Sequence, residues 1–227
     1  MASYPTQWTT ISQANSFHPH LITNIDLTDD SFLMSLLPES PEQWSCSLDV
    51  IYTLPPSVFV DRYQLNDTLG RSFFVHGLDD LESPLEHVDH QDTWVIVRPS
   101  PNIQIDLPVH LRYQAPDRSL THRLIHIQQP RVGWSCHHGN KKPTLDQTFD
   151  FFFSRSQSLT WIQLPSNSSS HDISLQVPVG NTTDAFLVQW GTFFTILLGT
   201  AWILHATLFA VKKHRRHEAK GKRRKSE

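Results

Sequence analysis

Apolar residues follow two different patterns along this chain. In much of residues 46–184 they alternate with polar residues, which is the period of a strand with one buried face. From Ala185 to Val211 they run as AFLVQWGTFFTILLGTAWILHATLFAV, without Asp, Glu, Lys or Arg. About 20 apolar residues cross a hydrocarbon core of ~30 Å. The patterns therefore predict a β-rich domain followed by a single membrane-spanning helix, 185–211. A buried helix of a soluble domain is disfavoured, because core helices are usually shorter and amphipathic.

The alternation is clearest in NIQIDLPVHLRYQ (102–114), where Ile, Leu, Val and Tyr share one face. Within it, Pro108 removes a ladder donor and predicts an edge strand. Further strands are expected at 47–54, 57–65, 93–99, 123–130, 148–153, 159–165 and 172–179. Short strands separated by Pro, Gly, Asn and Ser are typical of an antiparallel β-sandwich. Residues 1–45, rich in Ser, Thr, Pro and Asn, are expected to form an irregular lead-in.

The span has a pattern of its own. Gly191, Thr195 and Gly199 recur every four residues, so they stack on one helix face. Small residues let another helix approach closely, and Thr can form a hydrogen bond across such a contact. The stripe predicts a helix-packing face, although ordinary tolerance of Gly and Thr in membrane helices accounts for the same residues.

Charge is unevenly distributed in this chain of net charge −3. Of its 19 Lys and Arg, nine follow Val211, and of its 22 Asp and Glu, two do. Residues 212–227 are therefore net positive by seven and the rest is net negative by ten. Basic residues beside a span are retained on the cytoplasmic side, which predicts a basic cytosolic tail and a lumenal β-domain. The alternative of nucleic-acid binding is weaker for a basic run that directly abuts a span.

The N-terminal stretch MASYPTQWTTISQANSF has no basic segment followed by an apolar one, so no secretory signal is visible. We expect either a start upstream of Met1 or insertion directed by the span itself. A tail-anchored protein with a cytosolic domain is a third option, against which the basic tail argues.

Two cysteines and three sequons bear on a lumenal location. Cys46 and Cys136 each follow Trp-Ser and could pair in an oxidising compartment, or remain as two separate buried thiols. Asn66, Asn167 and Asn181 each begin an Asn-X-Thr/Ser tripeptide, and Asn181 is close enough to the span for the membrane to hinder its modification.

Candidate catalytic and metal-binding groups have simpler explanations. The run Asp79-Asp80-Leu81-Glu82 could hold a divalent cation, but a solvated acidic loop explains it as well. Histidines are spaced three apart at 87 and 90 and four apart at 122 and 126, and His137 and His138 follow Cys136. Positions four apart on a strand lie ~13 Å from one another, too far for one zinc ion. We expect no catalytic site, no metal and no cofactor.

Three stretches together resemble the PIG-X family and its fungal counterparts. They are VFVDRYQL (58–65), DLESP (80–84) and LPVHLRYQAP (107–116), and the similarity covers residues 45–211. The family has an aspartate-then-tyrosine motif, an acidic segment with proline, an H-x-R-Y-x-x-P-like strand, a C-terminal span and a short tail. The matching residues are Asp61, Arg62, Tyr63, His110, Arg112 and Tyr113.

The resemblance leads us to expect separate roles for these residues. His110 and Arg112 would share a polar docking face of the edge strand. Tyr63 and Tyr113 would be core or semi-core residues. Asp61 and Arg62 would pair with neighbouring side chains or with a partner.

The resemblance also implies a function. The chain would be a non-catalytic subunit of glycosylphosphatidylinositol (GPI) mannosyltransferase I in the endoplasmic reticulum membrane. It would stabilise a multi-span, PIG-M-like catalytic partner that adds the first mannose during GPI-anchor biosynthesis. Two other classes remain: a lumenal cargo receptor or chaperone-type glycoprotein, and an enzyme that uses the histidines or the 79–82 carboxylates.

Overall fold

The computed structural model describes residues 6–27, 44–77, 81, 83–88, 90–99, 104–139, 141–153, 159–164 and 172–224, the last nine in backbone only. The chain divides into two compact units. The first consists of residues 1–116 and 120–180, and the second of residues 117–119 and 181–227.

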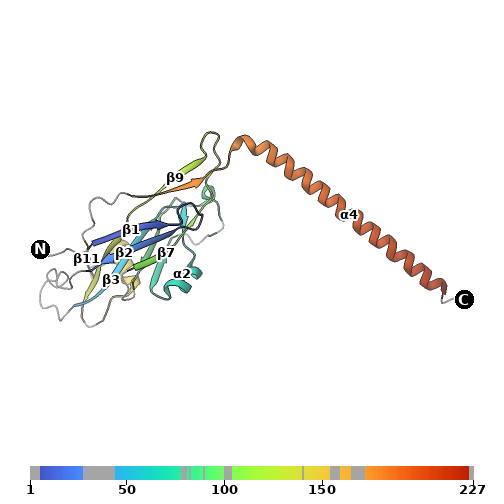
Figure 1. Ribbon diagram of the computed structural model, residues 1–227. Helices are drawn as coiled ribbons and strands as arrows, with labels where there is room; N and C mark the ends of the chain where they lie inside the picture. The colour runs from blue at the N-terminus through green and yellow to red at the C-terminus, as the bar shows by residue number, and fades with distance from the viewer. Residues whose placement is uncertain are drawn as a thin grey trace. The chain divides into compact units, whose positions relative to one another are not determined.

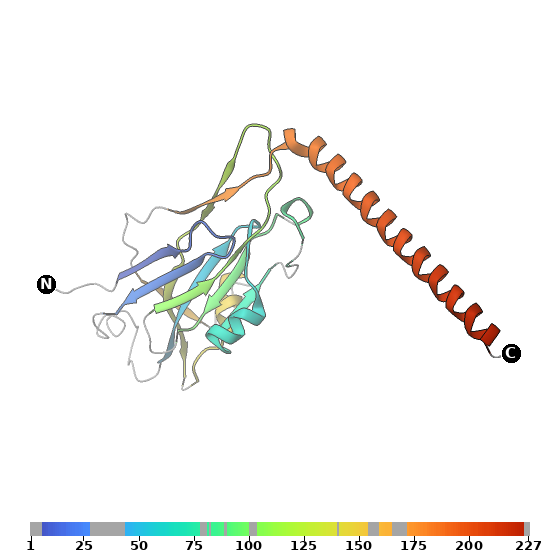
Figure 2. The ribbon, with the colours of Figure 1, turned by 45° about the vertical axis from the view of Figure 1, so that its right-hand side comes forward.

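Two antiparallel sheets form the body of the first unit (Figures 1 and 2). The smaller has the order β1 (Thr6–Ser12), β2 (His20–Asp26), β7 (Gln104–Pro108). The larger has the order β11 (Thr160–Gln163), β10 (Arg131–His138), β3 (Trp44–Leu54), β6 (Thr93–Val97), β5 (Phe73–His76). Two further pairs are β9 (His122–Ile127) with β12 (Ile173–Pro178), and β4 (Val58–Phe59) with β8 (His110–Leu111). The expected mainly β, antiparallel fold is confirmed.

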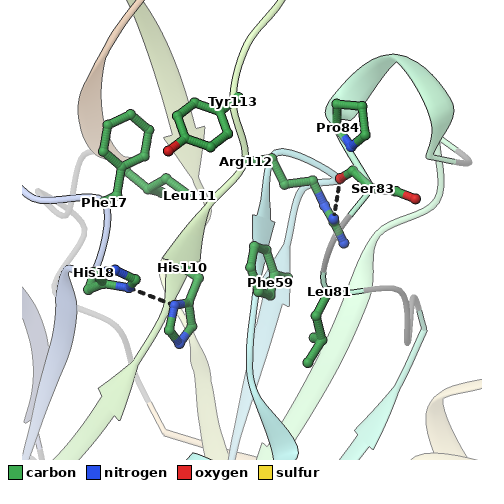
Figure 3. A pocket seen from close by; sticks show the side chains of 10 residues that line it. All are labelled: Phe17, His18, Phe59, Leu81, Ser83, Pro84, His110, Leu111, Arg112 and Tyr113. Atoms are coloured by element: carbon green, nitrogen blue, oxygen red, sulfur yellow. Dashed lines mark hydrogen bonds between the residues drawn. The ribbon is translucent and has the colours of Figure 1, made fainter. Parts of the chain in front are cut away.

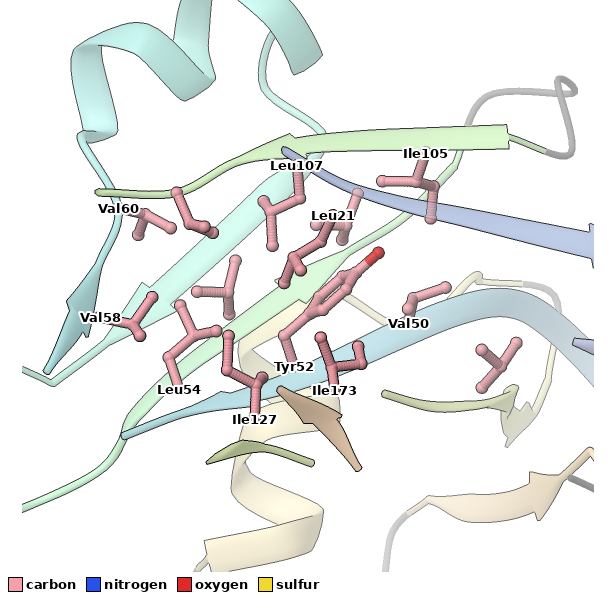
Figure 4. Close-up of a cluster of buried hydrophobic side chains, with 14 of the residues drawn as sticks. Leu21, Val50, Tyr52, Leu54, Val58, Val60, Ile105, Leu107, Ile127 and Ile173 are labelled. Carbon is pink, nitrogen blue, oxygen red and sulfur yellow. The ribbon is translucent and has the colours of Figure 1, made fainter. Parts of the chain in front are cut away.

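A hydrophobic core lies between these sheets and includes Ile127 and Ile173 of the β9–β12 pair (Figure 4). Leu21 and Leu107 from the smaller sheet and Val50 from the larger are fully buried in it. The Tyr52 hydroxyl crosses the core and donates to Thr23 Oγ1 at 2.7 Å, so a hydrogen bond joins the two sheets. Burial raises the pKa of the Tyr52 phenol, which keeps the hydroxyl a donor. This arrangement is sandwich-like.

The outer face of the larger sheet is covered by helix α3 (Leu145–Phe153). There Asp49, fully buried on β3, accepts hydrogen bonds from Thr148 Oγ1 of α3 at 2.9 Å and from Ser135 Oγ of β10. Arg98 donates to both carboxylate oxygens of Asp49, at 2.7 and 2.9 Å. Both faces of β3 are therefore buried, which explains why Asp49 and Ile51 are as hidden as Val50 and Tyr52.

Most expected strands are present, but the described part of the expected irregular lead-in at 1–45 contains a β-hairpin. Strands β1 and β2 pair over seven residues there, from Thr6 opposite Asp26 to Ser12 opposite His20. The sequence hides this hairpin because Thr23 takes a core position between Leu21 and Ile25. The structure divides the strand expected at 102–114 into β7 and β8, and leaves Ile103 outside the described residues. The edge position predicted from Pro108 is confirmed, since β7 ends the smaller sheet.

Two of the expected strands are instead wholly or partly helical. Within 57–65 only Val58–Phe59 is a strand, and α2 (Arg62–Leu69) begins after Asp61, whose side chain accepts from Tyr63 N at 2.8 Å. The segment 148–153 lies in α3, which starts with a reciprocal capping box. In it Thr144 Oγ1 accepts from Gln147 N and Gln147 Oε1 accepts from Thr144 N. Both helices begin at a side-chain cap, which favours a helix over the strand that β-propensity predicts.

The second unit is built on the long helix α4 (Ala185–Arg224), preceded by the 3-10 turn η3 (Thr182–Asp184). Residues Thr182–Arg215 are long and apolar enough to cross a membrane, with a mean hydropathy of 1.8 in their most apolar window, none of it buried. The helix fits a single-pass membrane protein. It does not end at Val211, because the basic segment continues it to Arg224.

Candidate docking surface

The motif strand β8 and the residues after it form one wall of a cavity of about 380 Å³ (Figure 3). The opposite walls come from the segment before β2, from β4, and from the loop ahead of the 3-10 turn η2 (Leu85–His87). Its lining residues are Phe17, His18, Phe59, Leu81, Ser83, Pro84, His110, Leu111, Arg112 and Tyr113. The hollow is mainly aromatic and aliphatic, with two histidines and one arginine in its walls. All of it belongs to the first unit.

Arg112 supports this cavity from within. Only 3% of the residue is exposed, and its guanidinium lies 4.6 Å from the centre of the Phe59 ring. It donates to the carbonyl oxygens of Pro56 at 3.1 Å and Ser83 at 2.7 Å. The prediction that Arg112 belongs to an exposed polar face is wrong, because backbone carbonyls and an aromatic ring take its donors and its charge inside the fold. The residue fixes the turn at 55–57 to the loop at 83–84.

His110 is half-buried and held from two sides. Its Nε2 lies 2.8 Å from Gln64 Oε1 of α2, and its Nδ1 lies 2.7 Å from His18 Nδ1. Because an amide oxygen only accepts, His110 Nε2 carries a proton, and in the neutral ring Nδ1 then accepts from His18. The ring also stacks on Phe59, with 5.1 Å between centroids.

The surroundings of His110 favour its neutral form. Burial lowers its pKa, and positive charge on His18 and His20 lowers it further, while Asp61 opposes the shift. A neutral imidazole in this position acts as a hydrogen-bonding spacer between α2 and the segment before β2, since both of its nitrogens have partners.

The two motif tyrosines lie on the surface, not in the core. Tyr113 is 74% exposed, and its ring lies tilted against that of Phe17 with 5.1 Å between centroids. Tyr63 is 82% exposed on the first turn of α2, one residue before Gln64. The expectation of core or semi-core tyrosines is therefore wrong. Alternation would bury Tyr113, but β8 ends at Leu111 and the chain leaves the sheet.

The remaining motif residues shape α2. Asp61 is the N-cap of this helix, and Arg62 donates to the Val75 carbonyl of β5 at 3.3 Å. Together with Gln64, these contacts fix the helix that carries Tyr63.

We call five residues the motif surface. Phe17, His18, His110 and Tyr113 line the cavity, and Tyr63 is exposed on α2 next to Gln64, which contacts His110.

Other residues singled out in the sequence lie elsewhere. Cys46 and Cys136 are direct cross-strand partners of β3 and β10 and form a disulfide that closes a separation of 90 residues. Asn66 is exposed on α2, whereas Asn181 caps η3 by accepting from Thr183 N at 2.9 Å. Asn167 lies outside the described residues, as do Asp79, Asp80 and Glu82.

Among the residues that the structure describes, no group of three His, Cys, Asp or Glu side chains is placed to hold a metal ion. On α4, Thr195 Oγ1 donates to the Gly191 carbonyl at 2.7 Å, so its donor is used within its own helix.

Sequence reasoning missed several residues of the site: Phe17, His18, Phe59 and Gln64. One signal could have found part of it. An Asp followed by RYQLNDTL and Gly70 has the cap residues of a short helix, and Gly70 indeed adopts a φ of 62°. Nothing in the sequence indicates that His18 meets His110, because the pairing depends on how β2 and β7 align.

Comparison with known proteins gives a consistent result. The family model described as PIG-X / PBN1 matches residues 14–208. Protein pbn1 of Schizosaccharomyces pombe is 27% identical over 175 residues, covering 67% of this chain and 50% of that protein. Protein pbn1 of Neurospora crassa is 29% identical over 184 residues, covering 70% and 36%. Protein PBN1 of Debaryomyces hansenii is 31% identical over 122 residues, covering 54% and 25%.

The chain thus spans half or less of the length of these curated relatives. No solved structure matches it.

Proposed function

This chain belongs to the PIG-X / PBN1 family, and on that premise we propose that it is a non-catalytic accessory subunit in GPI-anchor biosynthesis. Its complex is GPI mannosyltransferase I of the endoplasmic reticulum, which adds the first mannose. Its partner is a multi-span, PIG-M-like catalytic subunit. The observation that supports this role best is the division of the family motif into scaffold residues, whose polar groups are engaged within the domain, and exposed tyrosines.

The scaffold residues leave the surface free for contact with another protein. Arg112 and Asp61 have their polar groups engaged within the domain, and His110 links three segments through its two nitrogens. Tyr63 and Tyr113 are exposed although the same motifs contain them. Exposed tyrosines are common anchors of protein–protein contacts, and Tyr113 also lines the cavity. The motif surface is therefore proposed to bind a lumenal segment of the catalytic subunit.

The proposed topology places the β-domain in the lumen and the basic end of α4 in the cytosol. Nine basic residues after Val211 favour the cytosolic side for that end. A disulfide between Cys46 and Cys136 is compatible with the oxidising lumen. Asn66, exposed on α2, would then be accessible to glycosylation.

A second contact is proposed within the membrane. A methyl group added at Gly191 or Gly199 would meet no described atom within 4 Å, so both positions are open on the isolated helix. Larger side chains there would block only a neighbouring helix, as expected for a small-residue packing face.

The accessory subunit would act by mass action. Binding only to the folded catalytic subunit raises that subunit's free energy of unfolding. The population of its unfolded form falls as a result. The chain needs no reactive group for this role.

Deleting the gene and restoring it with variants tests the proposal. Deletion should lower both the abundance of the catalytic subunit and the amount of GPI-anchored protein at the surface, and the intact chain should restore both. Unchanged levels of both after deletion would refute the accessory role. Co-purification of many secretory clients, without a multi-span mannosyltransferase, would instead indicate a cargo receptor or chaperone.

A further inference from the structure

The second unit contains a short turn from elsewhere in the chain, residues 117–119, attached to the start of α4. Asp117 and Asn181 form a parallel β-bridge, and Thr182 N donates to the Asp117 carbonyl at 3.2 Å. Thr182 is also the first residue of the stretch that can cross a membrane. The turn is therefore fixed by hydrogen bonds to the point where the span begins.

The turn itself is internally ordered. Asp117 Oδ1 accepts from Ser119 N at 2.8 Å and from Ser119 Oγ at 3.0 Å. This bonding turns the chain sharply and leaves Arg118 exposed at its tip. The tip thus presents a cation beside the first residue of the span.

Chain geometry sets the depth of this tip. Three residues in a 3-10 turn rise about 6 Å, which separates Thr182 from Ala185 by roughly one headgroup layer. The uncharged run that follows is about 40 Å long as a helix, about 10 Å more than the hydrocarbon core, and tilt or extension of its ends into the headgroups absorbs the excess. Trp190 fits the interface on the inner side of that layer.

We propose that the tip of the 117–119 turn rests on the membrane surface, with the Arg118 guanidinium on lipid phosphate oxygens. A guanidinium can donate two parallel hydrogen bonds to one phosphate, and a long cationic side chain can reach toward the headgroups. The contact would fix the orientation of the first turn of the span. It rests on the membrane-spanning role of α4 and not on the identity of any protein partner.

Fluorescence quenching on the full chain in phosphatidylcholine nanodiscs tests this proposal. Both native cysteines form a disulfide, so Ser119→Cys supplies one reactive thiol for an environment-sensitive dye. Lipids with a nitroxide on the headgroup should quench this dye about as strongly as a dye at Ala185→Cys, and aqueous iodide should quench it weakly. Strong iodide quenching without loss from the nitroxide lipid would overturn the proposal.

Matched variants isolate the arginine. In the Ser119→Cys background, Arg118→Lys should keep most of the nitroxide quenching and Arg118→Gln should lose a substantial part of it. Equal quenching in all three would show that the tether alone holds the tip, which would overturn the phosphate contact. Quenching that disappears from pure lipid and requires the reconstituted catalytic subunit would identify a protein occupant, and would also contradict the proposal.

Discussion

Two arginines of the β-domain, Arg98 and Arg112, are stabilised in different ways and serve different regions. Arg98 pairs with the buried carboxylate of Asp49 and donates to the Pro143 carbonyl at 2.6 Å. Arg112 donates to two backbone carbonyls and lies over Phe59. The first region joins a helix to a sheet, and the second shapes the cavity that the exposed Tyr113 lines.

The difference between these two regions indicates that the first contributes mainly to stability and the second to recognition of a partner. Around Asp49 the described polar contacts are made between residues of the domain, and the nearby disulfide joins the same two strands, β3 and β10. Arg112 is fixed by comparable contacts within the domain. The motif tyrosines Tyr63 and Tyr113, in contrast, are not covered by the domain itself. Variants of the first region should change folding, and variants of the second should change partner binding.

The largest loss of stability should follow removal of the disulfide. Replacing Cys46 and Cys136 with Ser opens a loop of 90 residues, for which the chain-entropy model gives about 4–5 kcal/mol. Urea unfolding followed by tryptophan fluorescence measures this difference. A loss well under 1 kcal/mol would show that β3 and β10 do not depend on the cross-link.

Asp49→Asn should have the next largest effect. Removing one member of a fully buried ion pair typically costs about 3–5 kcal/mol. Because Arg98 is 25% exposed, the loss should lie toward the lower end of that range. The matched control is Asp106→Asn, whose carboxylate pairs with His20 but is 58% exposed. The control should change the free energy of unfolding by about 0–1 kcal/mol. Similar losses in both variants would contradict the distinction between buried and exposed pairs.

Arg112→Lys should destabilise the domain less, by about 1.5–3 kcal/mol, since an ammonium cannot reproduce the planar set of donors. Hydrogen exchange should increase first in the loop at 83–88, which Arg112 holds through Ser83. If exchange increases uniformly instead, Arg112 supports the whole fold and not the cavity in particular.

The pH dependence of stability should report His110. The pKa of His110 is lowered in the folded chain, whereas a histidine in the unfolded chain has a pKa of about 6.5. As the pH falls, the unfolded chain therefore takes up the proton at a higher pH than the folded chain does. The His110 contribution to stability is therefore retained above that value and lost as the pH falls through it toward the lower pKa of the folded state. Unfolding at a series of pH values should show a steeper decrease for the native chain than for His110→Gln. Parallel curves for the two chains would show that His110 does not cause the loss of stability at low pH.

Tyr63→Ala with Tyr113→Ala should change stability least, within about 0.5 kcal/mol, as is usual for exposed positions. The same double variant is expected to lower the abundance of the proposed catalytic subunit. Trp8→Ala offers a control, because Trp8 is an exposed aromatic of β1 outside the motif surface. A loss of partner in the control, or none in the double variant, would argue against the motif surface as the contact.

Most of the core of this fold can be predicted from the sequence, but little of the site can. Alternation correctly buries Ile105 and Leu107 on β7 and Leu111 on β8, although the structure divides the expected strand in two. It fails at Arg112, whose partners Pro56 and Ser83 are backbone carbonyls that carry no residue-type signal. The capping box at Thr144 could have been read from the sequence, but the aromatic run after it favours a strand by propensity alone.

Affinity purification of the full chain in mild detergent tests the central claim most directly. The native chain should retain a multi-span mannosyltransferase, the Trp8→Ala control should retain it equally, and the Tyr63→Ala/Tyr113→Ala variant should lose most of it while remaining folded. Absence of any mannosyltransferase from the native purification, under conditions that preserve other membrane complexes, would contradict the proposed function.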